Sequence, residues 1–206
     1  MTKTVSKLYI VLALSALAFL TVTPALADVI TYSTTGGFSA NGGASSATFG
    51  SGGNTLTLTF SGIVDSTVMA PPASNASAGF ITASVTGTGG TATGNFTLTI
   101  DQTSPTVDSG GLSGILSGTI QSNSSTGTLD FSSTNLTLGN VLYTLQQPIG
   151  GYELVPPSTL NGETSVQMQI DVTSVPEPAF FGLTGLGFLG IAGIAFRRHR
   201  QARSSQ

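Results

Sequence analysis

Carboxylates are the only side chains in the central part of this 206-residue sequence that could drive a reaction by themselves. Asp101 and Asp108 flank a turn-like stretch, residues 102–107, and could meet across it. Two carboxylates about 5 to 10 Å apart can cleave a glycosidic bond, and carboxylate oxygens also suit Ca²⁺. The sequence has no Trp to grip a sugar and no EF-hand spacing. We therefore interpret these residues as solvated loop acids and expect no catalytic residue, metal site or cofactor.

All basic residues lie near the two ends of the chain. Between Asp28 and Val175 there is no Lys, Arg, His or Cys, and the single His is His199. A serine nucleophile there would lack a neighbouring base. Phosphate backbones are bound through Lys and Arg, so nucleic acid is not expected as a partner. The central part has a formal charge of -8, from Asp28, Asp65, Asp101, Asp108, Asp130, Glu153, Glu163 and Asp171.

Residues 1–27 have the three parts of an export signal. Lys3 and Lys7 precede an apolar run, residues 8–20. This run is too short for a transmembrane helix, which needs about 20 apolar residues to cross a bilayer. The small residues Ala25 and Ala27 follow, which predicts cleavage before Asp28. We expect the Sec translocon and signal peptidase to process this segment.

Residues 179–196 predict a transmembrane helix, because they contain no charge and would span about 27 Å at about 1.5 Å per residue. An arginine cluster follows at once, and such clusters stay in the cytoplasm. The central part would therefore face outward, in agreement with the export signal. The cluster consists of Arg197, Arg198, Arg200 and Arg203.

A proline-rich tripeptide, Pro176-Glu177-Pro178, stands directly before this span. Each proline lacks an N–H and biases the preceding residue away from helix, so the peptide should be extended at the membrane surface. The order of tripeptide, Gly-rich span and arginine cluster resembles the PEP-CTERM sorting signal of Gram-negative bacteria. The resemblance covers residues 175–206 and implies cutting near the tripeptide by exosortase, a membrane-embedded transpeptidase-like enzyme. Proteins of this kind are associated with extracellular polysaccharide and biofilm.

Residues 28–174 predict one all-β domain. In residues 55–60, leucines and a phenylalanine alternate with threonines, which is the pattern of a half-buried strand, and residues 96–100 and 166–172 repeat it. Further strands are expected at 29–34, 80–85, 114–121, 127–131 and 136–145. About eight to ten strands favour an antiparallel β-sandwich, for which a jelly-roll-like connection is one option. The signal helix and the transmembrane helix would flank it.

Irregular structure is expected at several glycines and prolines. Residues 69–78, with two prolines, predict a surface loop. Gly110 and Gly111 predict a turn, and Gly139-Asn140 a bulge within one strand. Tyr152 could stack on a sugar, but packing against its own domain is the favoured interpretation.

The sequence thus predicts an exported, non-enzymatic protein of the cell surface or extracellular matrix. Exosortase, the inner membrane as a transient anchor and exopolysaccharide are the expected partners. Two alternatives stay open: a carbohydrate-binding module with a defined pocket, and a carbohydrate-active enzyme that uses two carboxylates.

Overall fold

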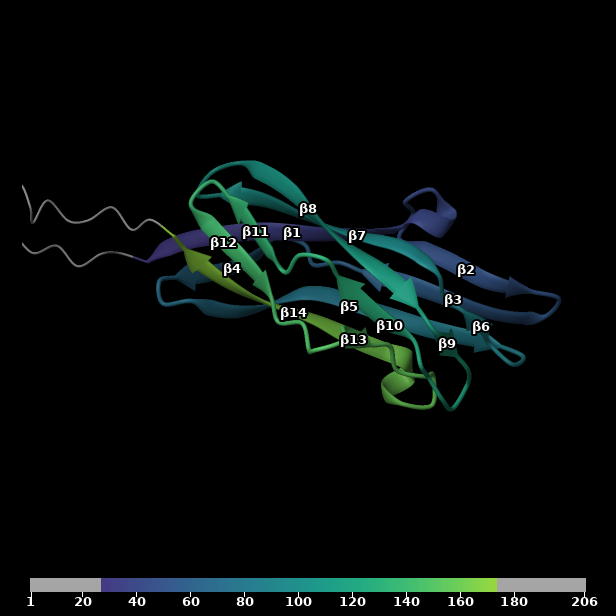
Figure 1. Ribbon diagram of the computed structural model, residues 1–206. Helices are drawn as coiled ribbons and strands as arrows, with labels where there is room; N and C mark the ends of the chain where they lie inside the picture. Colours follow the sequence, from purple (N-terminus) through teal and green to yellow (C-terminus); the bar gives the residue numbers. More distant parts are fainter. Residues whose placement is uncertain (1–26, 174–206) are drawn as a thin grey trace, which may run out of the picture. The chain divides into compact units, whose positions relative to one another are not determined.

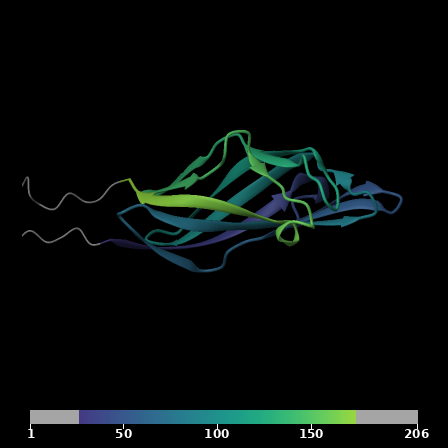
Figure 2. The ribbon, with the colours of Figure 1, turned by 90° about the horizontal axis from the view of Figure 1, so that it is seen from below.

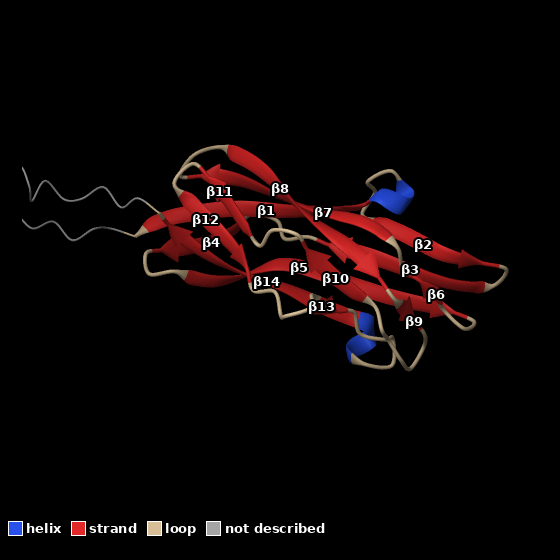
Figure 3. Ribbon diagram, viewed as in Figure 1, coloured by secondary structure: helices blue, strands red, loops and turns tan. Residues whose placement is uncertain are grey.

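Alternation of apolar residues with Ser and Thr gives strands along most of the described chain. The computed structural model describes residues 27–173. Within that range the only helices are two single 3-10 turns, η1 (Ser39–Asn41) and η2 (Leu160–Gly162), drawn in blue in Figure 3. The predicted all-β class is therefore confirmed for these residues.

Two curled, six-stranded antiparallel sheets form the fold (Figures 1 and 2), consistent with the predicted sandwich. Sheet A has the order β13 (Tyr152–Glu153), β10 (Thr128–Phe131), β8 (Asp108–Ser117), β7 (Gly94–Ser104), β1 (Asp28–Phe38) and β4 (Ser66–Ala70). Sheet B has the order β11 (Asn135–Leu138), β12 (Val141–Leu145), β14 (Glu163–Val172), β5 (Ser74–Thr86), β3 (Asn54–Ser61) and β2 (Ser46–Ser51). A separate pair consists of β6 (Gly90–Thr91) and β9 (Thr119–Ile120).

The core lies between the sheets and is made by the alternate residues of each strand. In β3, Leu56, Leu58 and Phe60 point inward and are buried, as their spacing predicts. The inward residues of β7 and β14 are buried in the same way: Phe96, Leu98, Ile100, Val166, Met168, Ile170 and Val172. The residues between them form the outer faces; they are mostly threonines along β3 and β7, and Ser165, Gln167, Gln169 and Asp171 along β14.

A row of aromatic rings runs through this core. Phe96 lies at its centre, with ring centroids 4.9 Å from Phe38, 5.3 Å from Phe60 and 6.2 Å from Phe131. Phe131 in turn contacts Tyr152 edge to face at 6.2 Å. Tilted and edge-to-face contacts of this kind stabilise a core beyond the area they bury.

A bulge in β5 exposes backbone carbonyls to the inside of the sandwich. The β5–β14 register places Gly79 opposite Val166 and Ser77 opposite Gln167, which leaves Ala78 without a partner. Extra residues of this kind disrupt the ladder locally. The carbonyls near the bulge therefore need partners from elsewhere.

Side-chain hydroxyls of β1 in the opposite sheet supply these partners. The Thr34 hydroxyl donates to the Ala78 carbonyl at 2.8 Å and accepts from the Ile63 N–H at 2.8 Å. The Tyr32 hydroxyl donates to the Ser77 carbonyl at 2.9 Å. Both side chains are buried, so these bonds join sheet A to sheet B within the interior, where a hydrogen bond is electrostatically stronger than in water.

A second buried link joins the sheets elsewhere. The Tyr143 hydroxyl on β12 donates to Gln102 Oε1 on β7 at 2.8 Å, and Gln102 Nε2 donates to the Thr106 carbonyl at 2.9 Å. Gln102 is only 1% exposed. Within residues 27–173, no buried side-chain nitrogen or oxygen lacks a hydrogen-bond partner.

The prediction of a surface loop at residues 69–78 is wrong. Residues 66–70 form β4 and residues 74–86 form β5, so only Pro71, Pro72 and Ala73 remain as a turn. The short, weakly apolar residues around Ser74 concealed the start of the strand. Pairing with β14 nevertheless holds it in the sheet.

The bulge expected at Gly139-Asn140 is a hairpin turn instead. Leu138 pairs with Val141, so residues 135–145 form two strands, β11 and β12, joined by a two-residue loop. Gly139 has a φ of +57°, which suits the first position of such a loop.

The turn expected at Gly110-Gly111 lies inside β8, which continues to Ser117. A Cβ on Gly110 would lie 2.8 Å from a Leu136 methyl and 3.0 Å from a Leu138 methyl, so a glycine at this position lets β11 pack closely over β8. The strand expected over 114–121 is broken at Gly118, where φ is +99°.

We predict that Thr34→Val destabilises the body, because it leaves the Ala78 carbonyl and the Ile63 N–H buried without partners. Each unpaired group costs about 1–3 kcal/mol. Urea unfolding of the variant should show a clearly lower midpoint. Thr97→Val, the same change at an exposed position of β7, should alter the free energy of unfolding by less than about 0.5 kcal/mol. Equal midpoints for the two variants would contradict the role given to Thr34.

Candidate functional site

The predicted sorting residues lie outside the described part of the chain. This applies to Pro176, Glu177 and Pro178, to the span 179–196 and to the cluster Arg197, Arg198, Arg200 and Arg203. Ala25 also falls outside, whereas Ala27 and Asp28 begin the described range. In residues 27–173 no helix has the length and apolar character needed to cross a membrane.

The residues that adjoin these segments lie at one end of the sandwich. Asp28, the first residue of β1, pairs with Ala70 in β4. Ile170, near the end of β14, pairs with Ser74 in β5. Because only a three-residue turn separates Ala70 from Ser74, β1 begins where β14 ends, as Figure 1 shows. The chain therefore enters and leaves the fold at the same end, which we call the terminal end.

Hydrogen bonds fasten the last strand at the terminal end. The Thr173 N–H donates to the Asn140 carbonyl at 2.8 Å, and the Thr173 hydroxyl donates to the same oxygen at 3.0 Å. The described fold thus continues to Thr173, and only Ser174 and Val175 stand between it and the predicted Pro176-Glu177-Pro178 motif in the sequence. Little chain separates the body from that motif.

Asp101 and Asp108 lie near each other on the β7–β8 hairpin and both accept a hydrogen bond from Ser109. Asp101 faces Ser109, whose hydroxyl donates to it across the β7–β8 pair. Asp108 accepts from the N–H of Gly139 at 3.1 Å and from the N–H of Ser109 at 2.9 Å. Asp108 thereby ties the β7–β8 turn to the β11–β12 turn. No group of three or more Asp, Glu, His or Cys side chains suited to a metal occurs in residues 27–173.

The tyrosine considered for sugar stacking belongs to the core. Tyr152 is 5% exposed, and its hydroxyl donates to the Gln167 carbonyl at 3.1 Å. Packing against its own domain was the favoured interpretation, and the structure confirms it. Burial raises the pKa of Tyr152 to about 12. Burial also raises the pKa of Tyr143 and that of Tyr32 above the usual value for tyrosine.

An open hollow of about 700 Å³ lies on the outer face of sheet A. Thr35, Thr97 and Thr99 form its floor, and the turn at Gly42-Gly43 forms one wall. Its lining contains only Ser, Thr and Gly. Such a surface offers hydroxyl groups but no titratable group for acid–base chemistry.

Two structural roles escaped sequence reasoning. Sequence reasoning did not predict that Gln102 would be buried and bound to Tyr143, or that Asp108 would accept a hydrogen bond from the Gly139 N–H. The second contact joins turns 31 residues apart in the chain. The position of Asp108 just after a proline turn was the only available signal.

Comparison with known proteins gives no match, since no family model, curated protein or solved structure is significantly similar to this chain.

We predict that the body loses stability as the pH rises from about 10 to about 12. An unfolded tyrosine ionises near pH 10, whereas the buried ones keep their protons longer. Between these pH values the unfolded state binds fewer protons than the folded state, so alkali favours unfolding. Below about pH 10 the tyrosines are protonated in both states, and none of this stability is lost. Urea midpoints and tyrosinate absorbance across this range provide the measurement. Tyrosinate absorbance that develops near pH 10 while circular dichroism stays native would contradict the burial of all three tyrosines.

Proposed function

We propose that this chain is exported, held briefly in the inner membrane by residues 179–196, cut by exosortase near Pro176-Glu177-Pro178 and released to the cell surface or extracellular matrix. The Sec translocon and signal peptidase would remove residues 1–27. The proposal includes a signal helix and a transmembrane helix that flank the body, and a jelly-roll-like connection of its strands. The body would serve a structural or adhesive role among exopolysaccharide chains and would not be an enzyme.

The observation that carries the proposal is the order of parts in the tail: tripeptide, uncharged span, arginine cluster. The geometry of the body supports it. Because Asp28 and Val172 lie at the terminal end, a body tethered through its C-terminus would direct that end to the membrane. The freshly cleaved N-terminus would then be on the same side, and neither end would have to cross the fold.

A matrix role is supported by the chemistry of the outer faces. Outward positions of the strands are occupied mostly by Ser and Thr, as along β3 and β7. Several of these hydroxyls bond to one another across strands, among them Thr48 with Thr57 at 3.0 Å. Neutral hydroxyls form hydrogen bonds whose strength does not depend on ionic strength, which suits contact with hydrated polysaccharide.

The hollow above Thr35, Thr97 and Thr99 favours one second candidate, a carbohydrate-binding module. Its uncharged, hydroxyl-rich lining suits a neutral sugar more than an ionic ligand. A defined pocket would bind with saturable stoichiometry, whereas a matrix filler would not.

We predict that exported protein from cells with active exosortase ends near Pro176 to Pro178. Mass spectrometry of the mature C-terminus provides the measurement. Glu177→Gln should leave full-length protein in the inner membrane, because the single charge between the two prolines is lost. Glu163→Gln, which removes an exposed carboxylate of the body, should be processed normally. Exported protein that still carries Arg203 would refute the proposal.

A further inference from the structure

Exposed apolar side chains gather at the terminal end of the body. Val29 on β1 and Met69 on β4 are paired across the two strands and lie on the outer face of sheet A. Their side chains are 46% and 64% exposed, and that of Val107, in the β7–β8 turn, is 87% exposed. We call these three residues, together with Pro71-Pro72 in the β4–β5 turn, the apolar rim.

Strand register and hydrogen bonds place both turns of the apolar rim at the terminal end. Strand β7 runs antiparallel to β1, so it ends where β1 begins. The Ser104 hydroxyl, at the end of β7, donates to the Val29 carbonyl at 2.9 Å. On the other side of β1, the Ser74 hydroxyl donates to the Met69 carbonyl at 2.7 Å. The rim therefore lies at the end from which β1 and β4 are seen to extend in Figure 1.

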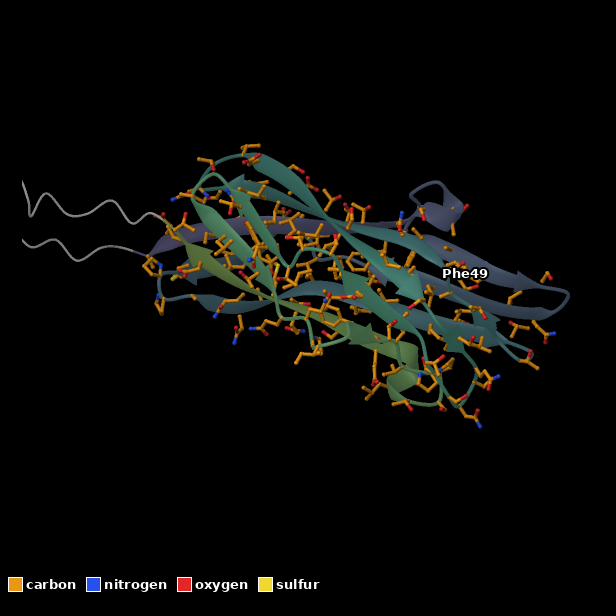
Figure 4. The ribbon with its side chains drawn as sticks, in the orientation of Figure 1. Phe49 is labelled. Carbon is orange, nitrogen blue, oxygen red and sulfur yellow. The ribbon has the colours of Figure 1, made fainter. Side chains whose placement is uncertain are left out.

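The opposite end of the body has a different surface. Strand β5 begins at the terminal end and pairs with β3 near its own end, so the turns 51–54 and 86–89 lie at the opposite end, close to Phe49 (Figure 4). These turns consist of Ser, Thr, Gly and Asn. Within residues 27–173, the other exposed large apolar side chains come from four separate segments: Val64, Ile115, Ile149 and Leu160. Single exposed residues of this kind are ordinary, whereas a group at one end indicates a binding surface.

The length of chain beyond the body limits how far the terminal end can be from a bilayer. Only the five residues 174–178 lie between Thr173 and the predicted span 179–196. Fully extended, they reach at most about 18 Å, at about 3.6 Å per residue. Strand β5 has 13 residues and is about 43 Å long at about 3.3 Å per residue. The terminal end is therefore the part of a tethered body that is nearest to the membrane.

We propose that the apolar rim contacts the outer surface of the inner membrane while the tail anchors the chain, with Met69 and Val107 inserted among the lipids. The inference rests on the proposed function, because it requires residues 179–196 to span the bilayer. Apolar groups bind such surfaces by entering the boundary of headgroups and acyl chains by about 5–10 Å. A few side chains bind weakly by themselves, but the tether gives them a high effective concentration at the membrane. The contact would end when the tail is cut.

Charge determines which lipid headgroups the apolar rim fits. Asp28, Asp108 and Asp171 lie at or next to strand ends at the terminal end. Residues 28–175 contain no Lys or Arg that could offset these carboxylates. An anionic lipid surface would repel them. The partner is therefore a bilayer of zwitterionic phospholipid.

Tryptophan emission tests the contact, because the chain contains no Trp. The uncut chain, residues 28–206, is made without exosortase and placed in phosphatidylcholine vesicles. Bromine on the acyl chains then quenches any tryptophan that enters the bilayer. Met69→Trp and Val107→Trp should each lose emission at least about twofold, since the rim enters by about 5–10 Å.

Ile115→Trp is the matched control, because Ile115 is also apolar and exposed on the outer face of sheet A. It lies seven residues beyond Asp108 along β8, which is about 23 Å at about 3.3 Å per residue. Its emission should change less than about 1.2-fold, because this distance exceeds the depth of about 5–10 Å.

A charge introduced into the apolar rim should weaken the contact. In the Met69→Trp chain, Val107→Asp should reduce the quenching at least about twofold, because a carboxylate resists transfer out of water. Ile115→Asp in the same chain should leave the quenching unchanged. Phosphatidylglycerol in the vesicles should reduce it, because this lipid is anionic. Circular dichroism that matches the unchanged chain verifies that each variant is folded.

Extraction with alkaline carbonate separates the two proposals. If carbonate releases the chain from the vesicles, residues 179–196 do not span the bilayer and both proposals fail. If the chain resists extraction but positions 69 and 115 are quenched equally, only the contact of the apolar rim is refuted. Blue-shifted emission at position 69 without quenching by brominated lipid would indicate a protein at the rim in place of lipid, and it also refutes the contact.

Discussion

Buried hydroxyl-to-carbonyl hydrogen bonds between the two sheets are the interaction on which this fold depends. The central part has no cation, so no salt bridge to Lys, Arg or His can orient one sheet against the other. Apolar packing supplies most of the free energy of folding, but it is non-directional and does little to fix the position of one sheet relative to the other. The hydroxyls of Thr34, Tyr32 and Tyr152 fix this relative position, because each of them donates to one particular carbonyl near the β5–β14 bulge. A shift of one sheet by a single residue would break all three of these hydrogen bonds.

The same register brings the two ends of the body together. Strands β4 and β5 are joined by a three-residue turn but belong to different sheets. On one side of this turn β4 pairs with the first strand of the body, through Asp28 and Ala70, and on the other side β5 pairs with the last strand, through Ser74 and Ile170. The terminal end is thus a consequence of how the sheets are joined. It is also compatible with the proposed tether at the C-terminus and the proposed cleavage at the N-terminus.

Period-two alternation sufficed to predict the all-β class and the most regular strands, because Leu56, Leu58 and Phe60 leave no other way to bury an apolar face. The failures have a common cause. Gly110 is of a type common in turns, yet it lies within β8. Its lack of a side chain makes room for Leu136 of β11, which is distant in the sequence. The pairing of Asp108 with Gly139 likewise depends on which turns meet in space. Such long-range contacts leave no mark on local composition, and the sorting motif lies beyond the described residues.

The distance between the two ends of the body tests the central claim most directly. Spin labels on Asp28→Cys and Thr173→Cys can be introduced without interference, since the chain has no other Cys. The account predicts a label separation under about 20 Å, because two packed sheets lie only about 10 Å apart. A separation near 35 Å, roughly the length of the 11-residue strand β1 at about 3.3 Å per residue, would place the ends at opposite ends of the sandwich and contradict it.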